Sequence, residues 1–310
     1  MPDAVIRCEA LDKRFGAVVA LDRLDLEVPP GVVVGFLGPN GAGKSTTIRI
    51  LLDLARPDGG HVEVLGSDPR AGGPPLRARI GYIPGELRLD ERLTVEQTLR
   101  SWGRIRGGGV DAAYVASLCD RFSLDPGRHT RGLSSGNRRK VGLVGAFMAR
   151  PELLILDEPT GGLDPLVQAE FQSLVEEVRA EGTTVFLSSH VLSEVQRSAD
   201  RVIVIRQGRA VASGAVDELR LSARQPFTVW FGAEAPEAEL RATSGVTDLV
   251  VRGREATGMV EGAPRALLDV LARHPVDHLL MPEPDLEDAF LRLYEDEARP
   301  DGPTDEDQSS

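Results

Sequence analysis

The segment from Gly38 to Thr46 constrains the fold of this chain more than any other feature. Its sequence, Gly-Pro-Asn-Gly-Ala-Gly-Lys-Ser-Thr, fits the pattern Gly-x4-Gly-Lys-Ser/Thr. The apolar run at residues 32–37 predicts a buried strand before it, and the apolar spacing of residues 47–54 predicts a helix after it. A strand, a glycine-rich loop and a helix in this order are the context that a phosphate-binding loop requires. The sequence therefore predicts an α/β fold around a phosphate site.

The pattern also predicts how this loop holds phosphate. Its glycines allow backbone N–H groups to point at the β- and γ-phosphates of a nucleotide, at a helix N-terminus that favours an anion. Lys44 is expected to pair with the β- and γ-phosphate oxygens, and the Ser45 hydroxyl is expected to ligate Mg2+. The alternative is a glycine-rich turn that contains a lysine by chance. The predicted nucleotide contacts in this loop are Gly38, Asn40, Gly41, Gly43, Lys44, Ser45 and Thr46.

The use of lysine supports this interpretation of Lys44. The chain has 36 basic residues, of which only Lys13, Lys44 and Lys140 are lysines. A compact ammonium group at this position therefore stands out against arginine, whose planar guanidinium is larger and differently shaped.

Composition limits the class of protein. With 310 residues, of which 41% are hydrophobic, the chain can bury the core of one large domain and a small one. A net charge of -12 without a basic stripe disfavours a nucleic-acid partner. Cys8 and Cys119 lie far apart, which predicts a reduced cytosolic chain without a disulfide framework or zinc site. The N-terminus lacks the features of a signal peptide, and the longest apolar stretch, 141–149, is about half of the ~20 residues that span a bilayer. Any membrane role is expected to require a partner.

The chain is predicted to have three parts. The first, residues 1–220, alternates short apolar strands with helices, which is typical of a mostly parallel sheet covered on both faces. Residues 4–30 alternate apolar and polar side chains, which predicts antiparallel strands, residues 72–75 are predicted to be a loop, and residues 86–150 a helical insert. Further predicted strands are 61–65, 80–84, 153–156, 184–188 and 202–206, and predicted helices are 94–102, 112–122, 135–149, 167–180 and 192–198.

The remaining residues are predicted to form a small accessory domain and a tail. Residues 221–297 have the pattern of an α+β domain that a helix at 285–296 closes. Residues 298–310 are acidic and lack apolar anchors, which predicts a disordered tail. The predicted elements of the domain are strands at 226–231, 247–252, 258–261 and 276–281 and a helix at 264–273.

A pair of carboxylates forms the second candidate feature. Asp157 and Glu158 end the apolar segment Leu-Leu-Ile-Leu-Asp-Glu at residues 153–158. Ligands of open α/β sheets bind at this end of the strands. Asp157 is expected to hold Mg2+, and Glu158 to polarise the water that attacks the γ-phosphate. The alternative is a solvated strand end without a chemical role.

Together with three further segments, these features make residues 4–220 resemble the ATP-binding cassette (ABC) family, the nucleotide-binding subunits of ABC transporters. Leu-Ser-Ser-Gly-Asn at residues 133–137 resembles the signature motif of the family, although Ser135 and Asn137 replace its usual Gly and Gln. Gly-Leu-Asp-Pro at residues 162–165 resembles its D-loop, and His190 its switch histidine. The fold that this implies is a P-loop NTPase core with a helical signature subdomain at about 86–150.

The resemblance assigns roles to these residues. Ser134 and the backbone N–H of Gly136 are expected to bind the γ-phosphate of ATP held by another subunit, whereas such a turn in isolation is a helix cap. Asp164 is expected to cross the dimer interface, and it also fits a helix N-cap before a proline. Phe15 is expected to stack on adenine, although an aromatic residue in a turn also serves packing. The catalytic residues expected are Lys44, Asp157, Glu158 and His190.

The sequence departs from the family after the strand at 80–84. The family usually has glutamine where this chain has Gly85, and Glu86 follows. A glycine has no side chain with which to ligate Mg2+ or orient water. We expect hydrolysis to survive, with Glu86 or a water molecule in the place of the glutamine.

The function that the resemblance implies is ATP hydrolysis, with Mg2+, in a homodimer that holds ATP between Lys44 of one chain and Ser134 of the other. The homodimer is expected to lie at the cytoplasmic side of the cell membrane, and to power export of a drug, antibiotic or lipid-like compound through a separately encoded transmembrane permease. Similarity of the C-terminal region to drug-export and antibiotic-export cassettes favours export. The alternatives are an importer cassette, a soluble cassette that acts on ribosomes or nucleic acid, and a regulator without turnover.

Overall fold

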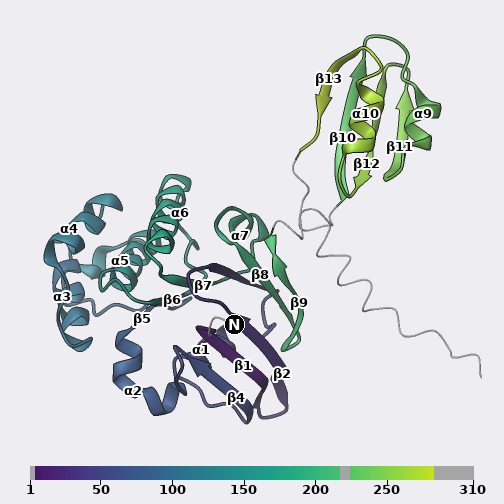
Figure 1. Ribbon diagram of the computed structural model, residues 1–310. Coiled ribbons are helices and arrows are strands. Elements are labelled where there is room, and N and C mark those ends of the chain that lie inside the picture. Colours follow the sequence, from purple (N-terminus) through teal and green to yellow (C-terminus); the bar gives the residue numbers. More distant parts are fainter. Residues whose placement is uncertain (1–3, 217–223, 283–310) are drawn as a thin grey trace, which may run out of the picture. The chain divides into compact units, whose positions relative to one another are not determined.

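The computed structural model describes residues 4–216 and 224–282, and the chain divides into two compact units, 1–214 and 215–310 (Figure 1). The helix predicted at 285–296 and the tail predicted at 298–310 lie outside the described residues. Within the described residues, no helix combines the length and the apolar character that a membrane crossing requires.

A six-stranded sheet in the order β5-β6-β7-β3-β8-β9 forms the centre of the first unit. The neighbours from β5 to β8 pair in parallel. Every residue of β3, β6 and β7 is buried, which is the pattern of parallel strands covered on both faces. The mostly parallel sheet is thus confirmed. Its strands are β3 (Val33–Leu37), β5 (Ile80–Ile83), β6 (Leu153–Asp157), β7 (Thr184–Ser189), β8 (Arg201–Arg206) and β9 (Arg209–Ala215), of which β9 was not predicted.

An antiparallel sheet in the order β2-β1-β4 packs onto the first helix of the unit. Its strands are β1 (Ile6–Phe15), β2 (Val18–Val28) and β4 (Gly59–Val64), and the helix is α1 (Lys44–Leu51). One buried cluster joins Leu11 and Leu24 of this sheet to Phe36 of β3 and Ile48 of α1. The ring of Phe36 in turn lies 5.2 Å from that of Phe186 in β7. The loop between β3 and α1 is therefore held from both sides by packed core.

The loop predicted around Gly73 is wrong, because this segment lies inside α2 (Pro69–Ala78). The Asp68 carboxylate caps the helix by accepting two backbone N–H groups at 2.8 and 3.0 Å. Gly73, with φ of 54°, interrupts the helix, and Pro74 and Pro75 follow at the start of a new turn. At that position a proline has no helical hydrogen bond to lose.

Three helices form the insert that follows β5. They are α3 (Val95–Ile105), α4 (Ala112–Arg121) and α5 (Ser135–Phe147), and each begins within one residue of its predicted start. A side-chain oxygen caps each helix, from Thr94, Asp111 and Ser134 respectively. A Cβ at Gly145 of α5 would lie 2.5 Å from ring carbons of Trp102 in α3, so this glycine allows the two helices to pack closely.

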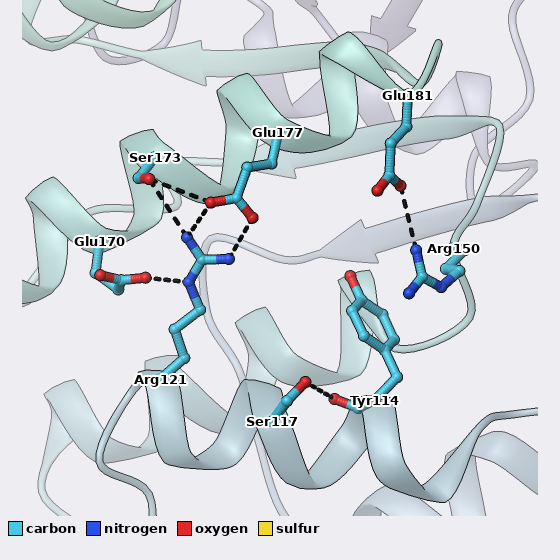
Figure 2. A network of polar contacts seen from close by, with 8 residues as sticks. All are labelled: Tyr114, Ser117, Arg121, Arg150, Glu170, Ser173, Glu177 and Glu181. Carbon is cyan, nitrogen blue, oxygen red and sulfur yellow. Dashed lines mark hydrogen bonds and ion pairs between the residues drawn. The ribbon is translucent and has the colours of Figure 1, made fainter.

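Arg121, the last residue of α4, fastens the insert onto α6 (Pro165–Ala180), as Figure 2 shows. Its Nη2 donates to Oε1 of Glu177 at 2.6 Å, and its Nε donates to the carboxylate of Glu170. The hydrogen bonds that Arg121 donates to Glu177 and Glu170 raise the pKa of its guanidinium. The guanidinium thus joins two elements that are far apart in the sequence.

A second arginine supports the same contact (Figure 2). Arg150 pairs with Glu181, directly after α6, at 3.2 Å. Its guanidinium carbon also lies 4.0 Å from the ring centroid of Tyr114 in α4, within the range of a cation–π interaction. The insert is therefore held beside α6 at both ends of α4.

Replacing Arg121 with methionine is expected to lower the free energy of unfolding by about 1–3 kcal/mol, because two carboxylates lose their charged donor. Arg92→Met is the matched control: Arg92 pairs at 2.7 Å with Asp90, two positions away, and because both side chains are open to solvent its loss is expected to leave the free energy of unfolding close to that of the wild type. Urea unfolding of the first unit measures the free energy of unfolding of both variants.

The loss of stability in Arg121→Met is predicted to depend on pH. Arg121 lowers the pKa of Glu177 from its ordinary value of 4.5, so the pair stabilises the fold above that value. The stability lost in Arg121→Met is therefore expected to shrink as the pH falls below 4.5. Equal stability of the Arg121 and Arg92 variants at pH 7 would contradict the proposed contribution.

Between residues 224 and 282, the second unit is an antiparallel sheet in the order β11-β12-β10-β13, with two helices. Alternate residues Phe227, Val229 and Phe231 of β10 are buried with Leu267 and Leu271 of the second helix. The small α+β fold is thus confirmed, although α9 was not predicted. Its elements are β10 (Arg224–Phe231), α9 (Glu237–Ala242), β11 (Val246–Arg252), β12 (Glu255–Glu261), α10 (Arg265–Leu271) and β13 (Val276–Leu280).

Candidate functional site

The loop between β3 and α1 is shaped to hold an anion. Gly41 and Gly43 have φ of 81° and 115°, which side-chain-bearing residues rarely adopt. Gly43 is the N-cap of α1 and no side chain caps this helix, so the first backbone N–H groups are open to a phosphate. A Cβ at Gly43 would lie 2.7 Å from the carbonyl oxygen of Ala20, so only glycine fits there.

Lys44 lies at the bottom of this loop with 5% of its surface exposed. Its Nζ donates to the carbonyl oxygens of Gly38 at 2.6 Å and Pro39 at 3.2 Å. Burial lowers the pKa of the Lys44 ammonium, and the charges of Glu158 and Asp157 oppose this shift. A partly desolvated cation therefore lies within electrostatic reach of both predicted carboxylates, as a triphosphate site requires.

Asp157, the last residue of β6, is held by the neighbouring strand. The parallel register sets Asp157 opposite Ser188 of β7, whose Oγ donates to Asp157 Oδ1 at 2.6 Å. The same Oγ accepts the backbone N–H of Glu158 at 3.2 Å. Ser188 was not among the predicted site residues, although it precedes His190 in the same Ser-Ser-His segment. One buried hydroxyl thus orients both members of the carboxylate pair.

Glu158 and His190 meet at the carboxyl ends of β6 and β7. His190 Nδ1 lies 3.1 Å from Glu158 Oε1, and both side chains are partly open to solvent. Glu158 has a φ of 49°, a conformation that costs energy for a residue with a side chain. An oriented carboxylate beside an imidazole suits activation of a water molecule. The structure therefore brings together Lys44, Asp157, Glu158 and His190.

The remaining predicted contacts of the glycine-rich loop, and Phe15, are open to solvent to different degrees. Asn40 and Ser45 are exposed, and Thr46 is half-buried in the first turn of α1. Phe15 ends β1 with 51% of its surface exposed, and Lys13 Nζ lies 5.2 Å from its ring centroid. An exposed ring of this kind has a free face for stacking. The Ser45 hydroxyl and the Asp157 carboxylate are oxygen donors of the kind that Mg2+ prefers, so the residues present fit a nucleotide with this cation.

The segment that resembles the signature motif starts α5. The Ser134 hydroxyl accepts the N–H of Asn137 at 3.3 Å and is exposed. A Cβ at Gly136 would lie 2.9 Å from the carbonyl oxygen of Gly162, so α5 begins directly against the segment that precedes α6. Asp164 caps α6 by accepting the N–H of Val167 at 3.0 Å. In the described part of the chain, no hydrogen bond or ion pair joins Ser134 or Gly136 to the glycine-rich loop.

The loop after β5 approaches the carboxylates through its backbone. A Cβ at Gly85 would lie 3.2 Å from Asp157 Oδ2, so the glycine itself lies beside this carboxylate. The Glu86 side chain is 79% exposed and pairs with Arg88 at 3.2 Å. Arg139 of α5 donates to the carbonyl oxygens of Pro84 and Gly85. Sequence reasoning missed Arg139, and the basic run at residues 138–140, directly after the signature-like segment, was the available signal.

Comparison with protein families and curated proteins agrees with this geometry. The family model described as ABC transporter matches residues 21–161. A daunorubicin resistance ATP-binding protein of Streptomyces coeruleorubidus is 37% identical, over 96% of this chain and 98% of the relative. A daunorubicin/doxorubicin resistance ATP-binding protein of Streptomyces peucetius is 40% identical, over 71% of this chain and 68% of the relative. A Nod factor export ATP-binding protein of Paraburkholderia xenovorans is 36% identical, over 71% and 73%.

Solved structures agree as well. The ATP-binding subunit of an ABC transporter superposes with a TM-score of 0.65 at 32% identity, over 70% of this chain and 92% of that one. A dimeric ATP-binding cassette with bound ADP and phosphate superposes with a TM-score of 0.62, over 68% of this chain and 98% of that one; at 20% identity it supports the fold alone. The resemblance found in the sequence is confirmed: the chain belongs to the ABC transporter family, as an ATP-binding and ATP-hydrolysing subunit.

Proposed function

We propose that two copies of this chain form an ATP sandwich that powers export of a drug, antibiotic or lipid-like compound through a separately encoded transmembrane permease. The observation that carries the sandwich is the turn at the start of α5, where Ser134 is exposed and where, within the described residues, neither Ser134 nor Gly136 has a hydrogen bond to the glycine-rich loop of its own chain. A helix N-terminus capped by serine suits a phosphate that another copy supplies. The relatives named for drug resistance and for Nod factor export favour export.

We assign the site residues as follows. Lys44 binds the β- and γ-phosphates, Ser45 and Asp157 ligate Mg2+, and Glu158 accepts a proton from the attacking water. His190 orients Glu158, whose carboxylate lies 3.1 Å from its imidazole. Magnesium supplies charge neutralisation of the phosphates when it is bound. The residues assigned to further nucleotide contacts are Phe15, Gly38, Asn40, Gly41, Gly43, Thr46, Ser134, Gly136 and Asp164, with Glu86 or water in the place of a side chain at Gly85.

The proposed function assigns a role to each predicted domain. Residues 1–220 are proposed to be the ATPase domain, with its helical subdomain at about 86–150, and residues 221–297 an accessory domain. We place the dimer on the cytoplasmic side of the cell membrane, bound to its permease. Reconstitution of the chain with a permease encoded beside it tests export: an amphiphilic dye should leave the vesicles' inner leaflet only with ATP, and a rate independent of ATP would refute the proposal.

Mixing two inactive variants tests the sandwich directly. Lys44→Ala and Ser134→Arg are each expected to hydrolyse no ATP, because every site in either homodimer carries one lesion. A mixed dimer restores one site, with Lys44 from one chain and Ser134 from the other. An equal mixture is therefore expected to recover about a quarter of the wild-type rate, since half of the dimers are mixed and each has one intact site of two. No recovery after subunit exchange would refute a site shared between chains.

A further inference from the structure

Arg139, in the second turn of α5, anchors the loop after β5 by its backbone, at Gly85, a position without a side chain. Its Nη1 donates to the carbonyl oxygen of Pro84 at 2.6 Å, and its Nη2 to that of Gly85 at 2.8 Å. A planar guanidinium that donates to two successive carbonyls fixes both the distance and the orientation of the loop. The position of the loop after β5 is therefore set from α5.

The loop that Arg139 holds lies against the catalytic carboxylates. The backbone at Gly85 approaches Asp157 so closely that a Cβ would lie 3.2 Å from Oδ2 of this carboxylate. Burial lowers the pKa of the Arg139 guanidinium, and the charges of Asp157 and Glu158 oppose the shift, which agrees with a cation close to this pair. A movement of the loop would thus change the surroundings of Asp157.

Arg139 also contacts the segment between the carboxylates and α6. A Cβ at Gly161 would lie 3.5 Å from Nη2 of Arg139 and 3.4 Å from the carbonyl oxygen of Glu158. On its open side the guanidinium lines a cavity of about 540 Å³, together with Glu86 and Arg138. The Arg139 side chain therefore touches both the loop after β5 and the segment after β6. In the portion of the chain that the structure describes, the neighbouring Arg138 lines the same cavity but makes neither of these contacts.

We propose that Arg139 is a positioning residue for ATP hydrolysis, which holds the backbone of the Gly85 loop against Asp157. The proposal rests on the function proposed above. The helix α5 begins at the Ser134 turn, which in the proposed sandwich contacts the γ-phosphate of ATP held by the other subunit. The two hydrogen bonds of Arg139 therefore connect this contact to the carboxylates of its own subunit. The loop thus follows α5 when ATP closes the dimer.

Arg139→Met, Arg139→Lys and the control Arg138→Met, each in the full-length chain, test this proposal. Hydrogen exchange without nucleotide measures the loop directly: amides at residues 85–88 are expected to exchange about tenfold faster in Arg139→Met, since two charge-assisted hydrogen bonds are lost, and at the wild-type rate in Arg138→Met. Exchange within β6 is expected to stay unchanged in all variants, which verifies that the fold is intact.

Steady-state kinetics separates positioning from binding. In Arg139→Met we expect kcat to fall about tenfold and KM for ATP to change less than twofold. Arg139→Lys keeps the charge but not the fork, so intermediate values of kcat and of loop exchange are expected. Full recovery by lysine, a wild-type kcat in Arg139→Met or a rise in KM that accounts for the lost activity would each overturn the proposal. A failure of the proposed function would be seen in a different experiment. The wild-type chain with its permease would then show no ATP-driven export, whatever the hydrogen-exchange rates of residues 85–88.

Discussion

Replacement of Glu158 with glutamine is expected to lower ATP turnover by about 10²–10⁴-fold and to leave ATP binding intact. An amide of the same shape cannot accept a proton from the attacking water. The substitution preserves the local fold, because Ser188 Oγ accepts the backbone N–H of Glu158 and not a side-chain group. The substitution leaves unchanged the Lys44 ammonium and the glycine-rich loop, to which phosphate binding is assigned.

Two measurements on Glu158→Gln, of its turnover and of its mass in solution, check this prediction. Phosphate release at saturating ATP gives the turnover, and light scattering gives the mass of Glu158→Gln with and without ATP. A stable dimer with ATP is expected, because the nucleotide that joins the two chains is no longer hydrolysed. A variant that stays monomeric with ATP would contradict the shared site.

Glu86→Gln is the matched control for the Glu158 variant. Glu86 belongs to the loop beside Asp157, but its carboxylate is exposed and pairs with Arg88 at 3.2 Å. Its loss is expected to slow turnover by less than about tenfold, as for a group that assists the metal indirectly. If Glu86→Gln lost turnover and Glu158→Gln kept it, the assignment of the general base would be wrong.

The parts of the site that a contiguous segment encodes were predictable from the sequence. The glycine-rich loop and the pair Asp157 and Glu158 each lie next to an apolar strand, and the order of the strands in an α/β sheet brings both to one edge. The position of His190 followed from the same rule, because it comes directly after β7, the strand next to β6. The helical insert was predictable as well, because α3 is strongly amphipathic and because α3, α4 and α5 each follow a capping residue.

The contacts that depend on tertiary packing were not predictable. Ser188 orients Asp157 only because of the register between β6 and β7, which no local pattern specifies. Arg139 reaches the carbonyl of Pro84 across 55 positions of the sequence, and an arginine on a helix is usually a solvated side chain. The error at α2 has a local cause: adjacent glycines and prolines are typical of loops, but here they divide one helix at Gly73.

Replacement of Gly43 with alanine is expected to remove ATP binding, with a loss of affinity of about 100-fold or more. At a φ of 115° any L-residue is strained, and the new Cβ would lie 2.7 Å from the carbonyl oxygen of Ala20 and 2.8 Å from Cδ2 of Leu21. The backbone of β2 cannot move away without breaking its pairing with β1, so the loop itself must shift. Two misdirected N–H groups at the start of α1 would forfeit about 3 kcal/mol of charge-assisted hydrogen bonding, which corresponds to this loss.

Gly41→Ala separates the two causes, conformation and space. Gly41 has a φ of 81°, but no atom lies within 4 Å of its added Cβ. This variant bears only the cost of the left-handed conformation, about 1–2 kcal/mol. Because the loop bears this cost both with and without ATP, the variant is expected to bind ATP less than about tenfold more weakly. Calorimetric titration with ATP gives both affinities, and urea unfolding shows whether Gly43→Ala is folded. Equal affinities for the two variants would mean that the contact with Ala20 does not shape the phosphate site, because the carbonyl of Ala20 is what distinguishes position 43 from position 41.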